Sequence, residues 1–247
     1  MKKQTRRSCI GTLTLRIAGA LILGLSAAVS TAGQEVVATS APDRLSQVAG
    51  VDLVSLRPDG LLARRVEDAE HILSTIPPRI AQLRTLIQEL DAAVEIKDSE
   101  IDIAKTEKDL ARRQRDEAEE DSAERTEELR EREKRLLERQ RTAAERKQRF
   151  LQAQGELMRS QIASFEQERE LNRLIEELAG LVDLEDAEGA PRRVAVRAQI
   201  AEQERETLEA LERFAEMEER SADRRRDFIR AQLRVVEARA ELAAVER

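Results

Sequence analysis

The feature that most constrains this chain is a seven-residue spacing of apolar side chains in a stretch that lacks proline from Arg79 to Leu184. Of the fifteen positions spaced by seven between Ile80 and Leu178, eleven are apolar. A repeat of seven keeps one side of a helix against a partner helix, because slight underwinding gives 3.5 residues per turn. The spacing predicts a long coiled-coil helix over residues 77–184.

The composition argues against a globular core. The 247 residues include no Trp or Tyr and only four Phe, and 38% of them are charged. High charge also permits disorder, but acidic and basic residues alternate here, as in long solvated helices. We therefore expect an all-α fold that is extended rather than globular. The net charge of −7 argues against nucleic acid as a partner.

Residues 1–32 have the pattern of a signal peptide. A basic start precedes an apolar run, and the small residues Ser30 and Ala32 occupy the positions expected before a cleavage site. The pattern predicts export, to the periplasm or beyond, with cleavage after Ala32. The alternative is an uncleaved anchor over residues 10–29, which would be the chain's only contact with a membrane. Cys9, the only cysteine, lies in this segment, so the exported chain is expected to lack disulfides.

Proline and glycine divide the remaining chain. Residues 33–60 are expected to form a flexible linker and residues 61–76 a short amphipathic helix, which ends at Pro77 and Pro78 because proline disrupts helix interiors. Gly189 and Pro191 mark a hairpin turn over residues 185–190. Residues 191–247 are expected to return as a final helix.

The final helix carries its own apolar column with a spacing of seven, from Val194 to Ala243. If the chain folds back near Gly189, facing positions of the two helices have residue numbers that sum to about 379, although a slip by seven residues preserves the pattern. This register places Phe150 near Phe228 and Phe165 near Phe214. The predicted hairpin seam consists of Phe150, Leu157, Phe165, Leu171, Leu178, Ala201, Leu208, Phe214, Ala222, Phe228, Ile229 and Val236.

The final helix is too short to cover the first half of the long helix. An apolar seam there would lack a partner within the chain, and exposed apolar seams are normally buried by another protein. We expect either self-association or binding of another helical envelope protein. The predicted interchain seam consists of Ile80, Leu83, Ile87, Leu90, Val94 and Ile101.

Residue types that carry chemistry are sparse. His71 is the only histidine, and no spacing of Cys, His or Ser indicates a metal site or a nucleophile. We expect no enzymatic activity, no cofactor and no metal.

The segment Asp227 to Ala244, DFIRAQLRVVEARAELAA, resembles the closing helical repeat of TolC-type outer-membrane efflux factors. The resemblance implies a channel in which membrane strands alternate with periplasmic helices, whereas this chain has no such strands and one such helical hairpin.

The preferred hypothesis is an exported, non-enzymatic coiled-coil protein that acts as a spacer, scaffold or adaptor in a cell-envelope assembly. The alternatives are a component of an efflux or transport system that contacts a TolC-type channel, and a periplasmic chaperone or hydrolase regulator.

Overall fold

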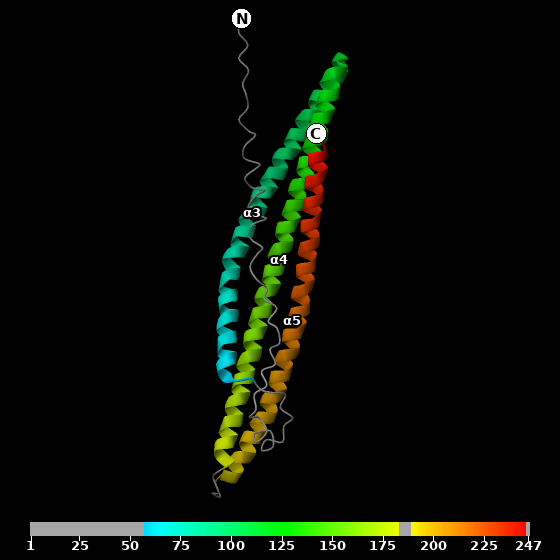
Figure 1. The fold of residues 1–247 in the computed structure, drawn as a ribbon. Helices are drawn as coiled ribbons and strands as arrows, with labels where there is room; N and C mark the ends of the chain where they lie inside the picture. The colour runs from blue at the N-terminus through cyan, green and yellow to red at the C-terminus, as the bar shows by residue number, and fades with distance from the viewer. Residues whose placement is uncertain (1–56, 183–188, 246–247) are drawn as a thin grey trace. The chain divides into compact units, whose positions relative to one another are not determined.

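The computed structural model describes residues 57–182 and 189–245. They form three α-helices: α3 Asp59–Gln114, α4 Glu117–Val182 and α5 Gly189–Val245. Helices α3 and α5 each run antiparallel to α4 and pack along it (Figure 1). The predicted all-α fold with an antiparallel helical hairpin is confirmed. The predicted signal peptide, almost all of the linker and most of the 185–190 turn lie outside the described residues.

Helix α3 continues through Pro77 and Pro78, so the break predicted at this point is wrong. Its buried side chains explain why. A single column with a spacing of seven runs along the whole helix and stays in phase across the two prolines: Leu62, Ala69, Ile76, Leu83, Leu90, Lys97, Ala104 and Ala111. Packing of this column against α4 holds the helix together where proline removes two backbone donors.

The predicted single helix over residues 77–184 is interrupted at Arg115 and Asp116. Arg115 adopts a left-handed conformation with φ 59° and ψ 35°. The Arg115 amide donates to the Arg112 carbonyl at 3.3 Å and the Asp116 amide to the Ala111 carbonyl at 3.1 Å, a Schellman motif without glycine. Asp116 then caps α4 by accepting the Glu119 amide at 3.1 Å. The chain reverses here, and α3 lies back along α4.

This reversal gives the predicted interchain seam a partner within the chain. Leu83, Leu90 and Ile101 are buried, while Ile80, Ile87 and Val94 are half-buried. Leu83 and Ile76 pack against Ala144 and Leu151 of α4, with Ile80 and Ile87 beside them. The expectation that this seam is left without an intrachain partner is therefore wrong, because the first half of the long helix folds onto the second.

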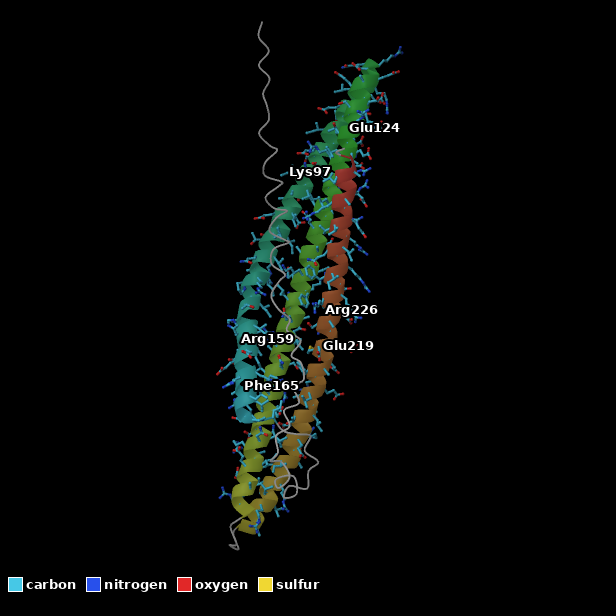
Figure 2. The ribbon with its side chains drawn as sticks, viewed as in Figure 1. Lys97, Glu124, Arg159, Phe165, Glu219 and Arg226 are labelled. Carbon is cyan, nitrogen blue, oxygen red and sulfur yellow. The ribbon has the colours of Figure 1, made fainter. Side chains whose placement is uncertain are left out.

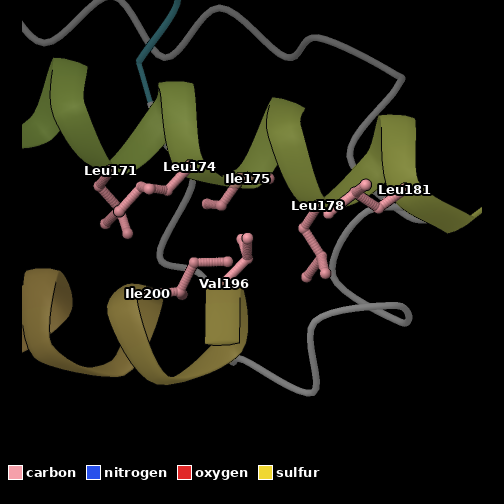
Figure 3. Close-up of a cluster of buried hydrophobic side chains, with 7 residues drawn as sticks. All are labelled: Leu171, Leu174, Ile175, Leu178, Leu181, Val196 and Ile200. Carbon is pink, nitrogen blue, oxygen red and sulfur yellow. The ribbon is translucent and has the colours of Figure 1, made fainter. Parts of the chain in front are cut away.

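The other side of α4 packs against α5. A cluster of buried side chains joins the two helices near the end of α4 (Figure 3): Leu171, Leu174, Ile175, Leu178, Leu181, Val196 and Ile200. Farther along, the rings of Phe150 and Phe228 stack with centroids 6.4 Å apart, as the sequence predicts.

Candidate interaction surface

Helix α5 turns two adjacent columns toward α4. The first contains Val196, Ala210, Ala231 and Ala238, and the second contains Ile200, Thr207, Ser221 and Phe228; all eight residues are buried. Both columns have a spacing of seven, as expected where two helices meet in a coiled coil. We call them the inner columns of α5.

The predicted hairpin seam is found in part: Leu171 and Leu178 of α4 belong to the cluster shared with α5 and Phe150 stacks on Phe228, whereas most of the predicted α5 residues are exposed. Phe165, Leu171, Leu178 and Phe228 are buried, and Phe150, Leu157 and Phe214 are half-buried. The remaining five α5 residues are exposed: Ala201, Leu208, Ala222, Ile229 and Val236. The predicted column contains the most apolar residues, but the two inner columns together form the face that packs on α4, although they include Thr207 and Ser221.

The register between α4 and α5 also differs from the predicted one. Arg146 lies 3.4 Å from Asp227, Arg132 donates to the Glu241 carbonyl at 3.1 Å, and Gln203 donates to the Gln167 carbonyl at 3.1 Å. The residue numbers of these pairs sum to about 373 rather than 379. This difference is not the seven-residue slip that preserves the pattern, because such a slip would keep the predicted column of α5 against α4.

The apolar column that α4 does not cover remains on the surface of α5. Val194 and Leu208 are each 67% exposed and Val236 is 62% exposed. The complete outer column of α5, every member of which is exposed, is Val194, Ala201, Leu208, Ala215, Ala222, Ile229, Val236 and Ala243. The outer column begins two residues before the inner column that contains Val196. At roughly 100° per residue, these two residues rotate the outer column by about 200° around the helix axis, which turns it away from α4. Leu211 and Leu233, also exposed, widen it.

Opposite charges flank the middle of the outer column. Glu218 and Glu219 precede Ala222, and Arg225 and Arg226 follow it; all four side chains are exposed. Figure 2 labels Glu219 and Arg226 on α5. Arg226 forms an ion pair with Asp223 of its own helix. The column is therefore apolar along its length, with an acidic pair and a basic pair at its centre.

The seam between α3 and α4 contains a ring of four charged side chains. Lys97, only 8% exposed, occupies the buried column of α3 and lies 2.7 Å from Glu100 and 2.8 Å from Glu133 of α4. Arg130 closes the ring, 2.8 Å from Glu133 and 3.1 Å from Glu100. Burial acts to raise the pKa of Glu133, but hydrogen bonds from Lys97 and Arg130 outweigh it and lower that pKa below its ordinary value.

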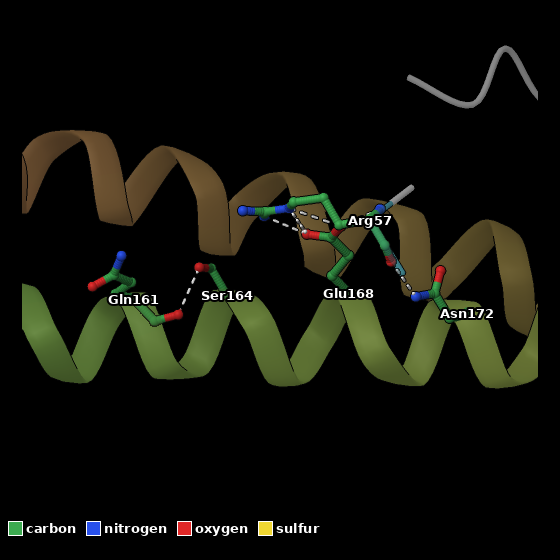
Figure 4. A network of polar contacts seen from close by, with 5 residues as sticks. All are labelled: Arg57, Gln161, Ser164, Glu168 and Asn172. Atoms are coloured by element: carbon green, nitrogen blue, oxygen red, sulfur yellow. Dashed lines mark hydrogen bonds and ion pairs between the residues drawn. The ribbon is translucent and has the colours of Figure 1, made fainter. Parts of the chain in front are cut away.

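A second polar contact fixes the beginning of α3 against α4 (Figure 4). The buried carboxylate of Glu168 accepts the Arg57 amide at 2.9 Å and also binds the Arg57 guanidinium. The same guanidinium lies 4.8 Å from the ring centroid of Phe165, and Asn172 donates to the Arg57 carbonyl at 3.0 Å. Neither this contact nor the Lys97 ring is evident from the sequence, because isolated charges in a highly charged chain have no distinguishing spacing.

Comparison with protein-family models, curated proteins and solved structures finds no significant match. None of the helices in the described part of the chain contains an apolar stretch of the length that a membrane span requires. The described residues also contain no cluster of three or more His, Cys, Asp or Glu side chains arranged to hold a metal ion.

Proposed function

We propose that this protein is an exported, non-enzymatic coiled-coil scaffold that joins components of a cell-envelope assembly. The observation that carries the proposal is the outer column of α5. Eight apolar residues with a spacing of seven remain exposed after α5 has filled its contact with α4. A coiled-coil column of this length is suited to binding another helix.

The contacts within the chain support a structural role. Each outer helix is held to α4 by a continuous seam, and ion pairs such as Arg141 with Asp91 at 2.7 Å and Lys134 with Asp98 at 2.6 Å join the surfaces of α3 and α4. These exposed pairs contribute little individually. Because α5 is supported along its length by α4, its outer column can form a rigid, extended binding surface for a partner.

Photo-cross-linking in intact cells tests the proposal. A photoreactive amino acid at Leu208 is expected to give discrete adducts that fractionate with the cell envelope. The matched control is the same amino acid at Glu206, which is exposed on α5 but lies outside the outer column. The proposal fails if the protein is absent from the envelope fraction, or if Leu208 gives no adduct beyond those formed at Glu206.

A further inference from the structure

We infer that the outer column of α5 binds the same column of a second copy, with the two helices antiparallel and a two-fold axis at Ala222. This inference rests on the proposed function and names the partner of its binding surface. With the two-fold axis at Ala222, a position in one copy lies level with a position in the second copy when their two residue numbers sum to 444. The outer column then pairs Ala215 with Ile229, Leu208 with Val236 and Ala201 with Ala243.

The distribution of charge supports this pairing. Side chains that flank the column on the same side of the interface meet when two helices run antiparallel. Glu218 then faces Arg225 of the second copy, and Glu219 faces Arg226 of the second copy. The symmetry repeats both contacts, so four oppositely charged contacts surround the central alanine. Complementary charges beside an apolar column set orientation and partner choice in coiled coils.

The same charges exclude the neighbouring registers. A slip by seven residues in one direction places Glu218 against Glu218 of the second copy, and a slip in the other direction places Arg225 against Arg225. In a parallel pair in register, Glu218 lies beside Glu219 of the second copy and Arg225 lies beside Arg226 of the second copy, so like charges meet in both places. Like charges at such positions oppose association. Among these arrangements, the antiparallel register centred on Ala222 satisfies both the apolar column and its flanking charges.

The surface needed for this contact is free within the described part of the chain. Helix α5 uses its inner columns against α4, and every member of the outer column is exposed. From Ala201 to Ala243 the paired stretch would extend about 63 Å at the rise of an α-helix. Helix α3 packs on α4 and does not cover this column.

Disulfide cross-linking of the full chain tests the register. Cys9 is replaced by Ser, and copies carrying Ala215→Cys are mixed with copies carrying Ile229→Cys. The mixture is expected to form a disulfide-linked dimer on mild oxidation. Copies carrying Ala215→Cys alone are the control, because their two cysteines would lie about 21 Å apart along the axis. A disulfide in that control indicates a parallel pair and overturns the proposal, as does the absence of a cross-link in the mixture.

A charge exchange tests the contacts independently by sedimentation equilibrium. Glu218→Arg is expected to raise the dimer dissociation constant by about tenfold or more. The new arginine faces Arg225 of the second copy, and the two-fold symmetry repeats this repulsive contact. Adding Arg225→Glu is expected to return the constant to within about threefold of the parent value. In the described part of the chain, neither Glu218 nor Arg225 forms an ion pair. Circular dichroism verifies that each variant remains helical.

Failure of the charge exchange to restore association, or a parent chain that stays monomeric, overturns the dimer. Such a result leaves the scaffold proposal in place if the Leu208 photo-adduct contains a different envelope protein. The scaffold proposal fails separately if the chain is absent from the envelope, whatever its mass in solution.

Discussion

Arg115 adopts a left-handed backbone conformation that favours glycine. Its φ of 59° places the Cβ atom against the following carbonyl, which costs roughly 1–2 kcal/mol for a residue other than glycine. Arg115→Gly is therefore expected to raise the free energy of unfolding by about 1 kcal/mol, after the added freedom of the unfolded chain is counted. Urea denaturation followed by circular dichroism measures the change.

Arg113→Gly is the matched control for Arg115→Gly. Arg113 is exposed in the last turn of α3, where its backbone is helical, so the same substitution is expected to lower stability by about 1 kcal/mol. Equal destabilisation by both substitutions would show that Arg115 does not adopt the left-handed conformation in solution.

Glu133 makes the seam between α3 and α4 sensitive to acid. Its pKa is lower in the folded chain than its ordinary value of 4.5. A carboxylate with a depressed folded pKa contributes stability that is present above the unfolded pKa and is lost as pH falls through the folded pKa. Glu133→Gln is thus expected to cost about 1–2 kcal/mol at pH 7, because it leaves Lys97 and Arg130 with one carboxylate instead of two.

The pH dependence separates this mechanism from a packing defect. Below the folded pKa the parent chain also carries a neutral side chain at position 133, so the difference between parent and variant is expected to vanish in acid. Unfolding curves at pH 7 and at an acidic pH below the folded pKa of Glu133 make the comparison. A difference of the same size at both pH values would contradict the charge-based account.

At the scale of the elements, α3 retains two prolines in its interior. Pro77 and Pro78 leave the carbonyls of Leu73 and Ser74 without their helical donors, and an interior proline costs about 3 kcal/mol. Replacing both prolines with alanine is expected to raise the free energy of unfolding by at least about 2 kcal/mol. Pro191→Ala is the control, because the first turn of α5 needs no donor there. A doubly substituted chain no more stable than the parent would indicate a real break at these residues.

Two valines in α5 distinguish its inner and outer faces. Val196 is 3% exposed and Val194 is 67% exposed, although only one residue separates them. Val196→Ala is expected to cost about 2 kcal/mol through lost burial and a residual cavity, whereas Val194→Ala should change stability by less than about 0.5 kcal/mol. Urea unfolding of the two variants tests which column packs on α4. A larger loss of stability from Val194→Ala than from Val196→Ala would indicate that the outer column faces α4, as the sequence predicted.

The helices could be predicted from the sequence better than their ends and their neighbours. The spacing of seven correctly indicated helix over residues 80–114, 117–182 and 191–245. Asp116 followed by Glu119 carried a capping signal for α4, but Arg115 in place of glycine concealed the preceding helix end. The column from Leu62 to Ala111 stays in phase across Pro77 and Pro78, a stronger indicator than the prolines themselves.

The candidate surface was identified in the sequence but given the wrong role. The outer column is apolar at all eight positions, whereas the inner columns contain Thr207 and Ser221. Counting apolar residues favours the outer column, but the two adjacent inner columns together give α4 a wider face than a single column does. Which of two competing faces of α5 meets α4 depends on contacts with a distant segment, which local spacing does not encode.

At the scale of the whole described unit, α4 is the helix on which the other two depend. One buried cluster joins α3 to α4 through Ile76, Leu83, Ala144 and Leu151, and a different cluster joins α4 to α5. Helices α3 and α5 are thus each held to α4 by a separate seam. Such an arrangement resembles repeat proteins, in which elements contact only their neighbours and stability is a sum of neighbouring interfaces.

Native-state hydrogen exchange tests this independence. Leu90→Ala, in the α3 seam, is expected to speed exchange of α3 amides while leaving α5 amides nearly unchanged; Ile200→Ala, in the α5 seam, should do the reverse. Each side chain is buried against α4, so each truncation leaves a cavity in one seam only. Faster exchange of both outer helices by the same factor in both variants would show that the three helices unfold as one cooperative unit. The described unit could then not release α3 or α5 while it keeps the other helix packed.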